Sequence, residues 1–167
     1  VHSLFVERWS YRGLFINAPT LAYLMEQCQS LKSLSLKDLD MDKNHCRVLG
    51  AYSRPDLEIS LVGCRITSTG ASTLVEVLGR NQGPTKVDRC DILLADGLRG
   101  NSRLKSLTPR SSSYLEVGHR EVLAIAAATR ENKGLDYLVL RYCLTLNDTT
   151  VGRQCTLRAS HLRRQMS

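Results

Sequence analysis

The chain has 167 residues, of which 43% are apolar and 23% charged, so it fits a soluble globular protein built as one domain or one short repeat array. This composition excludes a collagen, a mucin and a wholly disordered chain. No run of about 18 apolar residues occurs, which excludes a membrane-spanning helix. Glu7, Arg8 and Arg12 interrupt the apolar residues of the first segment, so we expect that this segment is not a secretory signal.

The net charge is +7, and much of it lies near the end of the sequence. No acidic residue follows Asp148, whereas four arginines do, so residues 1–148 carry a net charge of only +3. We expect residues 147–167 to form a basic, partly ordered C-terminal tail. Its arginines form no contiguous cluster and no aromatic side chain lies among them, which favours a solvated tail over nucleic-acid contact.

The first elements predicted along the chain are an end segment and a helix. Residues 1–19 are expected to form an N-terminal cap or the remnant of a further repeat. Apolar residues with helical spacing in TLAYLMEQCQS, at positions 20–30, predict a helix ahead of the first strand.

Five segments then share a template with apolar residues at positions 1, 4 and 6, cysteine or an apolar residue at 9, and an apolar residue at 11. They begin at residues 31, 56, 82, 104 and 135, and their alternating apolar residues predict short β-strands. In this alignment Asp56 takes the first position of its unit, and Thr85 and Leu107 take the fourth positions of theirs. The units lie in LKSLSLKDLDM, DLEISLVGCRI, QGPTKVDRCDI, SRLKSLTPR (in which the unit begins at Leu104) and LDYLVLRYCLT.

Amphipathic segments between these units predict helices. Asp42 is expected to cap a helix in DKNHCRVLGAY, and Ser68 to cap one that stops at Gly79. The segment ILLADGLRGN leaves room for at most two helical turns. The segment HREVLAIAAATRENKG predicts a longer helix that ends at Gly134.

Six cysteines, at positions 28, 46, 64, 90, 143 and 155, include no CxxC pair. Three recur in matching contexts, LVGCRI, VDRCDI and LRYCLT, as expected of one small, buried position that each unit reuses. We expect free buried thiols and a reducing, cytoplasmic location, with disulfides or a metal site as the alternatives.

The segment LEISLVGCRITSTGASTLVEVLGRN resembles the ribonuclease-inhibitor type of leucine-rich repeat, whose pattern is LxxLxLxxCxLTxxGxxxLxxxLxxN. The asparagine of GRN recurs in RGN and REN, at Asn101 and Asn132. The resemblance covers about five irregular repeats in residues 20–146 and fails at Asp56, Gln82, Thr85 and 108–118. It implies an α/β leucine-rich repeat solenoid, a short horseshoe arc with parallel strands on the concave face and helices on the convex face.

Members of this family mostly bind other proteins on the concave face. The resemblance therefore implies a non-enzymatic protein-interaction module, with a GTPase-activator-like role or nucleic-acid contact through the tail as alternatives. The outward positions are mildly basic, which favours an acidic protein partner. Uncapped ends of the array would also allow self-association. The candidate partner-binding residues are Lys32, Lys37, Lys86, Arg89, Lys105, Tyr137, Arg141 and Tyr142.

Motifs for catalysis or for a cofactor are absent from the sequence: GxGxxG, GxxxxGK[ST], HExxH and GxSxG do not occur. His45 and Cys46 are neighbours on a predicted helix and point about 100° apart, so we interpret them as an exposed histidine beside a buried cysteine. The acids of KDLDMD, Asp38, Asp40 and Asp42, lack the glycine and glutamate of a calcium loop. We therefore expect neither an enzyme nor a cofactor nor a metal site.

Overall fold

The computed structural model describes residues 2–7, 16–90, 95–109, 119–140 and 155–158. Its strands are β1 (Ser3–Glu7), β2 (Ser33–Lys37), β3 (Asp40–Met41), β4 (Glu58–Val62), β5 (Arg65–Ile66), β6 (Lys86–Cys90), β7 (Ser106–Pro109), β8 (Tyr137–Leu140) and β9 (Cys155–Arg158). Seven of them form one sheet in the order β1-β2-β4-β6-β7-β8-β9, which is also their order along the chain. The first six strands pair in parallel and β9 pairs antiparallel with β8. The predicted α/β class with a mostly parallel sheet is confirmed.

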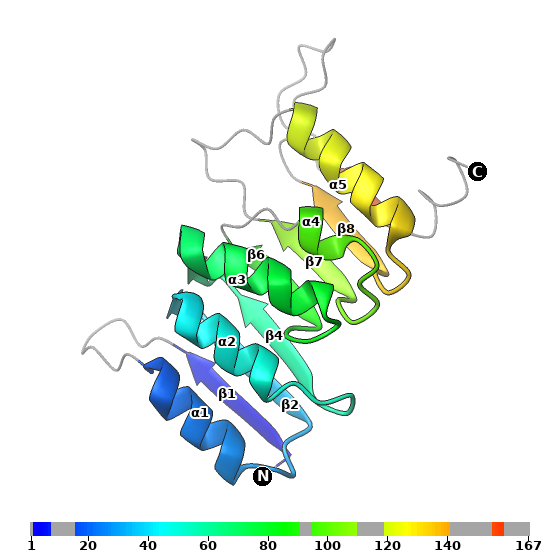
Figure 1. The fold of residues 1–167 in the computed structure, drawn as a ribbon. Helices are drawn as coiled ribbons and strands as arrows, with labels where there is room; N and C mark the ends of the chain where they lie inside the picture. The colour runs from blue at the N-terminus through cyan, green and yellow to red at the C-terminus, as the bar shows by residue number, and fades with distance from the viewer. Residues whose placement is uncertain (1, 8–15, 91–94, 110–118, 141–154, 159–167) are drawn as a thin grey trace.

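Helices connect successive strands of this sheet and lie along one side of it (Figure 1). Neighbouring helices also contact one another, most extensively α2 with α3. The short α4 agrees with the limit of two turns predicted for its segment. The helices are α1 (Ala18–Gln27), α2 (Lys43–Ala51), α3 (Ser68–Gly79), α4 (Ala95–Leu98) and α5 (His119–Glu131).

The hydrophobic core fills the space between the sheet and these helices. Leu36, Leu61, Val87, Leu107 and Leu138 lie opposite one another across five adjacent strands, and each is at most 1% exposed. Full burial of such a side chain contributes about 2 kcal/mol to folding. The alternation of apolar and polar residues that predicted these strands therefore also determines which face of the sheet is buried.

Two details of the strand alignment differ from the sequence prediction. Leu57, which is 1% exposed, fills the core at the start of the second unit, whereas Asp56 is exposed and pairs with Lys32. Leu107 lies opposite Val87 rather than Thr85, and the pairing of β6 with β7 is irregular at its end. A shift of two residues leaves the same alternate side chains facing the core, so the apolar pattern alone could not detect it.

Of the two helix caps predicted from the sequence, one is confirmed and one is wrong. Asp42 caps α2 as predicted, and its carboxylate accepts hydrogen bonds from the backbone N–H groups of Asn44 and His45. The cap of α3 is Thr67 rather than Ser68, because the Thr67 hydroxyl accepts from the Gly70 N–H. Ser68 is instead the first residue of the helix.

His45 is buried, at 9% exposure, so the prediction of an exposed histidine was wrong. Its Nδ1 lies 2.8 Å from the Asp42 carboxylate and its Nε2 lies 2.9 Å from the carbonyl oxygen of Ile16. The imidazole therefore joins the start of α2 to Ile16, two residues before the start of α1. Because Ile16 lies 29 residues away in the sequence, local pattern gave no sign of this contact.

The same left-handed backbone conformation occurs at the end of three of the strands. Asp38, Gly63 and Arg89 have φ angles of 54°, 63° and 52°, a left-handed conformation that costs a non-glycine residue about 1 kcal/mol. The residue after each is buried: Leu39, Cys64 and Cys90. Cys64 Sγ donates to the carbonyl of Leu36 at 3.4 Å, and Cys90 Sγ to that of Asp88 at 3.5 Å. The recurring position inferred from the cysteine contexts is thus a buried position behind a left-handed residue.

Two of the three recurring asparagines make the same buried contacts. The side-chain amide of Asn101 donates to the carbonyl of Leu78, and its oxygen accepts from the N–H groups of Arg103 and Leu104. Asn132 repeats this arrangement one unit later. Asn81 differs, because it is exposed, has a φ of 57° and accepts from Ser102.

The end segments each contribute a strand to the sheet. Within residues 1–19, predicted as a cap or remnant repeat, β1 pairs with β2 along its whole length. Within the tail 147–167, the described part is β9, which pairs with β8.

None of the helices in the described part of the chain has the length and apolar character that a membrane-spanning helix requires.

Candidate functional site

One face of the parallel sheet is left uncovered by the described helices. Parallel sheets are usually covered on both faces, so such a face is the first place to look for a partner. One row of outward residues has a member on each of the six parallel strands in direct register, and we call this set the central row. The central row consists of Phe5, Ser35, Ser60, Lys86, Ser106 and Tyr137.

Large side chains at the two ends of the central row flank small ones between them. Phe5 is 59% exposed and Tyr137 is 50% exposed, and both are among the few large apolar side chains that face solvent. Adjacent strands lie about 4.8 Å apart, so the two aromatic rings are separated by roughly 24 Å across five strand spacings. Between them lie three serines, which have small side chains, and Lys86, the charged member of the row.

The structure describes six of the eight residues predicted to bind a partner. Lys37, Lys86 and Tyr137 occupy outward strand positions, whereas Lys32 and Lys105 precede strands and Arg89 lies in the left-handed turn at the end of β6. Arg141 and Tyr142 lie outside the described residues. The six residues are therefore spread from β2 to β8, at both ends of the strands, and do not form one cluster.

Acidic neighbours pair with three of these basic residues. Lys37 Nζ lies 2.5 Å from the Glu7 carboxylate, and this hydrogen bond raises the pKa of Lys37 above its ordinary value. Arg89 Nε lies 3.6 Å from the Asp88 carboxylate.

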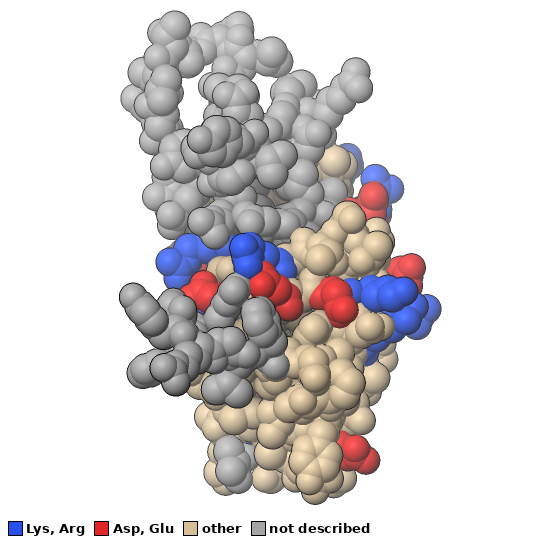
Figure 2. Space-filling model, turned by 90° about the vertical axis from the view of Figure 1, so that its left-hand side faces the viewer, with Lys and Arg blue, Asp and Glu red and all other residues tan. Residues whose placement is uncertain are grey.

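Lys32 Nζ lies 2.5 Å from the Asp56 carboxylate, and its hydrogen bond lowers the pKa of Asp56. Figure 2 shows basic and acidic side chains interleaved on the side of the molecule where the strands of Figure 1 end. The outward strand positions hold Glu7, Glu58 and Asp88 as well as the lysines, so the strands themselves offer no continuous basic surface.

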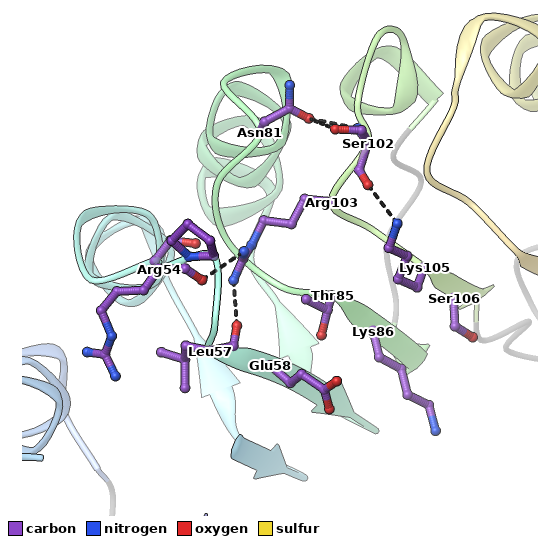
Figure 3. A pocket seen from close by; sticks show the side chains of 12 residues that line it. Arg54, Leu57, Glu58, Asn81, Thr85, Lys86, Ser102, Arg103, Lys105 and Ser106 are labelled. Carbon is purple, nitrogen blue, oxygen red and sulfur yellow. Dashed lines mark hydrogen bonds between the residues drawn. The ribbon is translucent and has the colours of Figure 1, made fainter. Parts of the chain in front are cut away.

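A pocket of about 670 Å³ opens beside the central row, where β4, β6 and β7 begin (Figure 3). Loops that enter three successive strands form its walls. Lys86 and Ser106 belong both to this pocket and to the central row, so the two features are continuous. We call it the Arg103 pocket after the side chain that holds its loops together.

Arg103 donates to backbone carbonyls of two preceding loops. Its Nε lies 2.7 Å from the Gly83 oxygen, its Nη1 3.0 Å from the Arg54 oxygen and its Nη2 2.7 Å from the Leu57 oxygen. Burial lowers the pKa of the Arg103 guanidinium. An arginine side chain is not deprotonated in proteins, so Arg103 keeps its positive charge. Sequence analysis missed Arg103, since its partners lie up to 49 residues away and no local motif marks them.

The acids of KDLDMD have separate roles in the structure. Asp40 forms a two-point pair with the Arg65 guanidinium, at 2.6 and 2.8 Å, while Asp42 caps α2 and Asp38 occupies the left-handed turn. Within the described residues, no three histidine, cysteine or acidic side chains come together as metal ligands would.

Comparison with known proteins adds no identification to this geometry. No protein-family model matches the chain, and no curated protein sequence matches it.

Proposed function

We propose that this chain is a non-enzymatic protein-interaction module that binds a protein partner on the uncovered face of its sheet. The observation that carries the proposal is the central row, a set of outward residues in strand register with half-buried serines in its middle and an exposed aromatic side chain at each end. Aromatic side chains supply large contact areas at binding surfaces, and exposed ones seldom stabilise an isolated fold. A segment of the partner would lie across the strands, over the serines and between Phe5 and Tyr137.

The module is proposed to be a short solenoid of the ribonuclease-inhibitor leucine-rich repeat type. Strands that follow chain order, helices on one side and the recurring left-handed turn support this assignment. The buried contacts that Asn101 and Asn132 share support it too. In such an array each unit packs on its neighbours and the strands present one continuous binding surface.

Site-specific photocrosslinking tests the proposed face. A photoreactive amino acid replaces Ser60 in the middle of the central row, and in a matched control it replaces Ser72, which is exposed on α3. We expect one defined protein to crosslink from position 60 and not from position 72 in cell extract. The Phe5→Ser and Tyr137→Ser variants should each reduce this crosslink.

Equal crosslinking from both positions, or none from position 60, would contradict the proposed face. Circular dichroism of each variant checks that the fold is kept, which we expect because Phe5 and Tyr137 are mainly exposed.

A further inference from the structure

The residues that line the Arg103 pocket carry an excess of positive charge. Its lining includes the cations Arg54, Lys86, Arg103 and Lys105 and a single anion, Glu58. Arg54 is turned away from the others in Figure 3, donates to the Leu31 carbonyl and lies near Asp56. The other three cations therefore determine the charge of the pocket.

Each of these three cations has donor capacity left for a ligand. Lys86 is exposed and has no ion-pair partner within the described residues. Lys105 Nζ makes one hydrogen bond, of 3.0 Å, to the Ser102 carbonyl, and an ammonium group has three N–H donors. Arg103 uses three of its five N–H donors on loop carbonyls, which fixes the guanidinium in place before any ligand arrives.

The charge of the pocket and its position together indicate the ligand. Glu58 and Lys86 point the same way in Figure 3, so the carboxylate of Glu58 offsets part of the positive charge of Lys86, Lys105 and Arg103. That leaves an excess of two positive charges, which favours an anion. Because Lys86 and Ser106 also belong to the central row, a ligand bound along the row is placed next to the pocket.

We propose that the Arg103 pocket binds the side-chain carboxylate of an acidic residue in the protein segment that occupies the central row. This inference rests on the proposed function and specifies the chemistry of the partner. Lys86 and Lys105 point in different directions in Figure 3, so their flexible side chains would turn toward the carboxylate, while the hydrogen-bonded Arg103 supplies a fixed positive charge. The partner segment would then combine apolar contacts at its ends with one acidic residue near its middle.

Fluorescence anisotropy with synthetic peptides tests the proposal on the full chain. The probes are labelled (Gly-Ser-Glu)4, its glutamine and lysine analogues and a phosphoserine analogue, and free acetate and inorganic phosphate serve as competitors. We expect the glutamate peptide to bind more tightly than the glutamine peptide and the lysine peptide not to bind. The double variant Lys86→Gln/Lys105→Gln should weaken glutamate-peptide binding about tenfold, as expected for the loss of two exposed ion pairs.

A double variant with the same net charge serves as the control for nonspecific attraction. Lys43→Gln/Lys133→Gln removes two exposed lysines away from the pocket and should leave binding within about twofold. Equal binding of the glutamate and glutamine peptides, or equal loss in both double variants, would overturn the proposal. Tighter binding of the phosphoserine peptide than of the glutamate peptide would overturn the proposal in favour of a phosphate ligand. Displacement of the glutamate peptide by acetate at the same concentration would overturn it in favour of a small free acid.

The outcomes separate this inference from the proposed function. If the glutamate peptide does not bind but the crosslink from position 60 still depends on Phe5 and Tyr137, the proposed carboxylate site is wrong and the proposed binding face is supported. If the peptides bind in the pocket but the crosslink is absent, the binding face is wrong.

Discussion

The side-chain amide of Asn132 donates a hydrogen bond of 2.8 Å to the backbone carbonyl of Leu98, which belongs to the preceding unit of the fold. The same side chain accepts from the N–H groups of Gly134 and Leu135, and it is 1% exposed. One buried amide therefore satisfies three backbone groups that water cannot reach. Removing it deprives all three of this hydrogen bond.

We expect Asn132→Ala to lower the free energy of unfolding by roughly 2–4 kcal/mol, because buried polar groups lose their hydrogen bonds. Urea unfolding followed by circular dichroism measures the change. Asn81→Gly is the matched control, since Asn81 is exposed and its positive φ suits glycine. A loss of under 1 kcal/mol for Asn132→Ala would contradict the structural role assigned here.

Replacement by alanine should have opposite effects on stability at two of the glycines. A methyl group at Gly134 would overlap the backbone of Ser102, whereas one at Gly79, at the end of α3, would meet nothing within 4 Å. Gly134→Ala should therefore destabilise the protein by more than about 2 kcal/mol, and Gly79→Ala should stabilise it by about 0.5–1 kcal/mol. Thermal unfolding compares the two variants directly. The same sign of change in both would show that this packing is wrong.

The Asp42 carboxylate that caps α2 makes the stability of the protein depend on pH. Hydrogen bonds from the His45 backbone and side chain, together with that from the Asn44 backbone, lower the pKa of Asp42. Because the folded pKa lies below the unfolded one, this stabilisation is present above about pH 4 and is lost as the pH falls through the folded pKa. Asp42→Ala should cost about 1 kcal/mol at pH 7.

Asp42→Asn keeps a capping oxygen but cannot ionise. Its free energy of unfolding should therefore fall less steeply than that of the wild type between about pH 5 and about pH 2. Urea unfolding at a series of pH values measures both curves, and parallel curves would exclude a contribution from Asp42 ionisation.

The described thiols should differ in reactivity. Burial raises the pKa of Cys46 to about 12, and the Cys64 thiol together with burial raises the pKa of Cys90. A thiolate is the reactive species, so alkylation of Cys46 and Cys90 at pH 8 should be slow in the folded protein and fast in urea. Half-buried Cys28 should react sooner. Peptide mapping by mass spectrometry resolves the sites, and rapid labelling of Cys46 in the folded state would contradict its burial.

Arg103 should not be replaceable by lysine. A lysine ammonium has no planar fork and cannot reach three carbonyls in separate directions, so Arg103→Lys should lose roughly 1–3 kcal/mol of stability. Arg99→Lys is the matched control, because Arg99 is exposed after α4. Equal midpoints of urea unfolding in the two variants would exclude Arg103 as the link between the loops.

Sequence pattern predicted the parts of this molecule that depend on neighbours in the chain. Alternating Leu34 and Leu36 mark β2, and Asp42 marks the start of α2, because each acts within a few residues of itself. The shift that places Leu107 opposite Val87 was missed because it leaves the apolar face unchanged. The burial of His45 and the role of Arg103 were missed because both depend on carbonyl oxygens far away in the sequence.

The candidate site was predicted only in part for the same reason. Lys86 and Tyr137 could be placed on the outward face from alternation, and they lie there. The pairing of Lys37 with Glu7 depends on β1, which the template did not include. The pocket beside the row depends on how three loops meet, and a linear pattern does not contain that information.

The hydrogen bonds of Arg103 have a consequence for how the protein unfolds. When units interact only with adjacent units, the ends of an array can open while its middle stays folded. Arg103 instead connects the loop before β7 to the loops before β4 and β6, so three consecutive units share one set of bonds. Hydrogen exchange should therefore show β4, β6 and β7 opening together as one cooperative block.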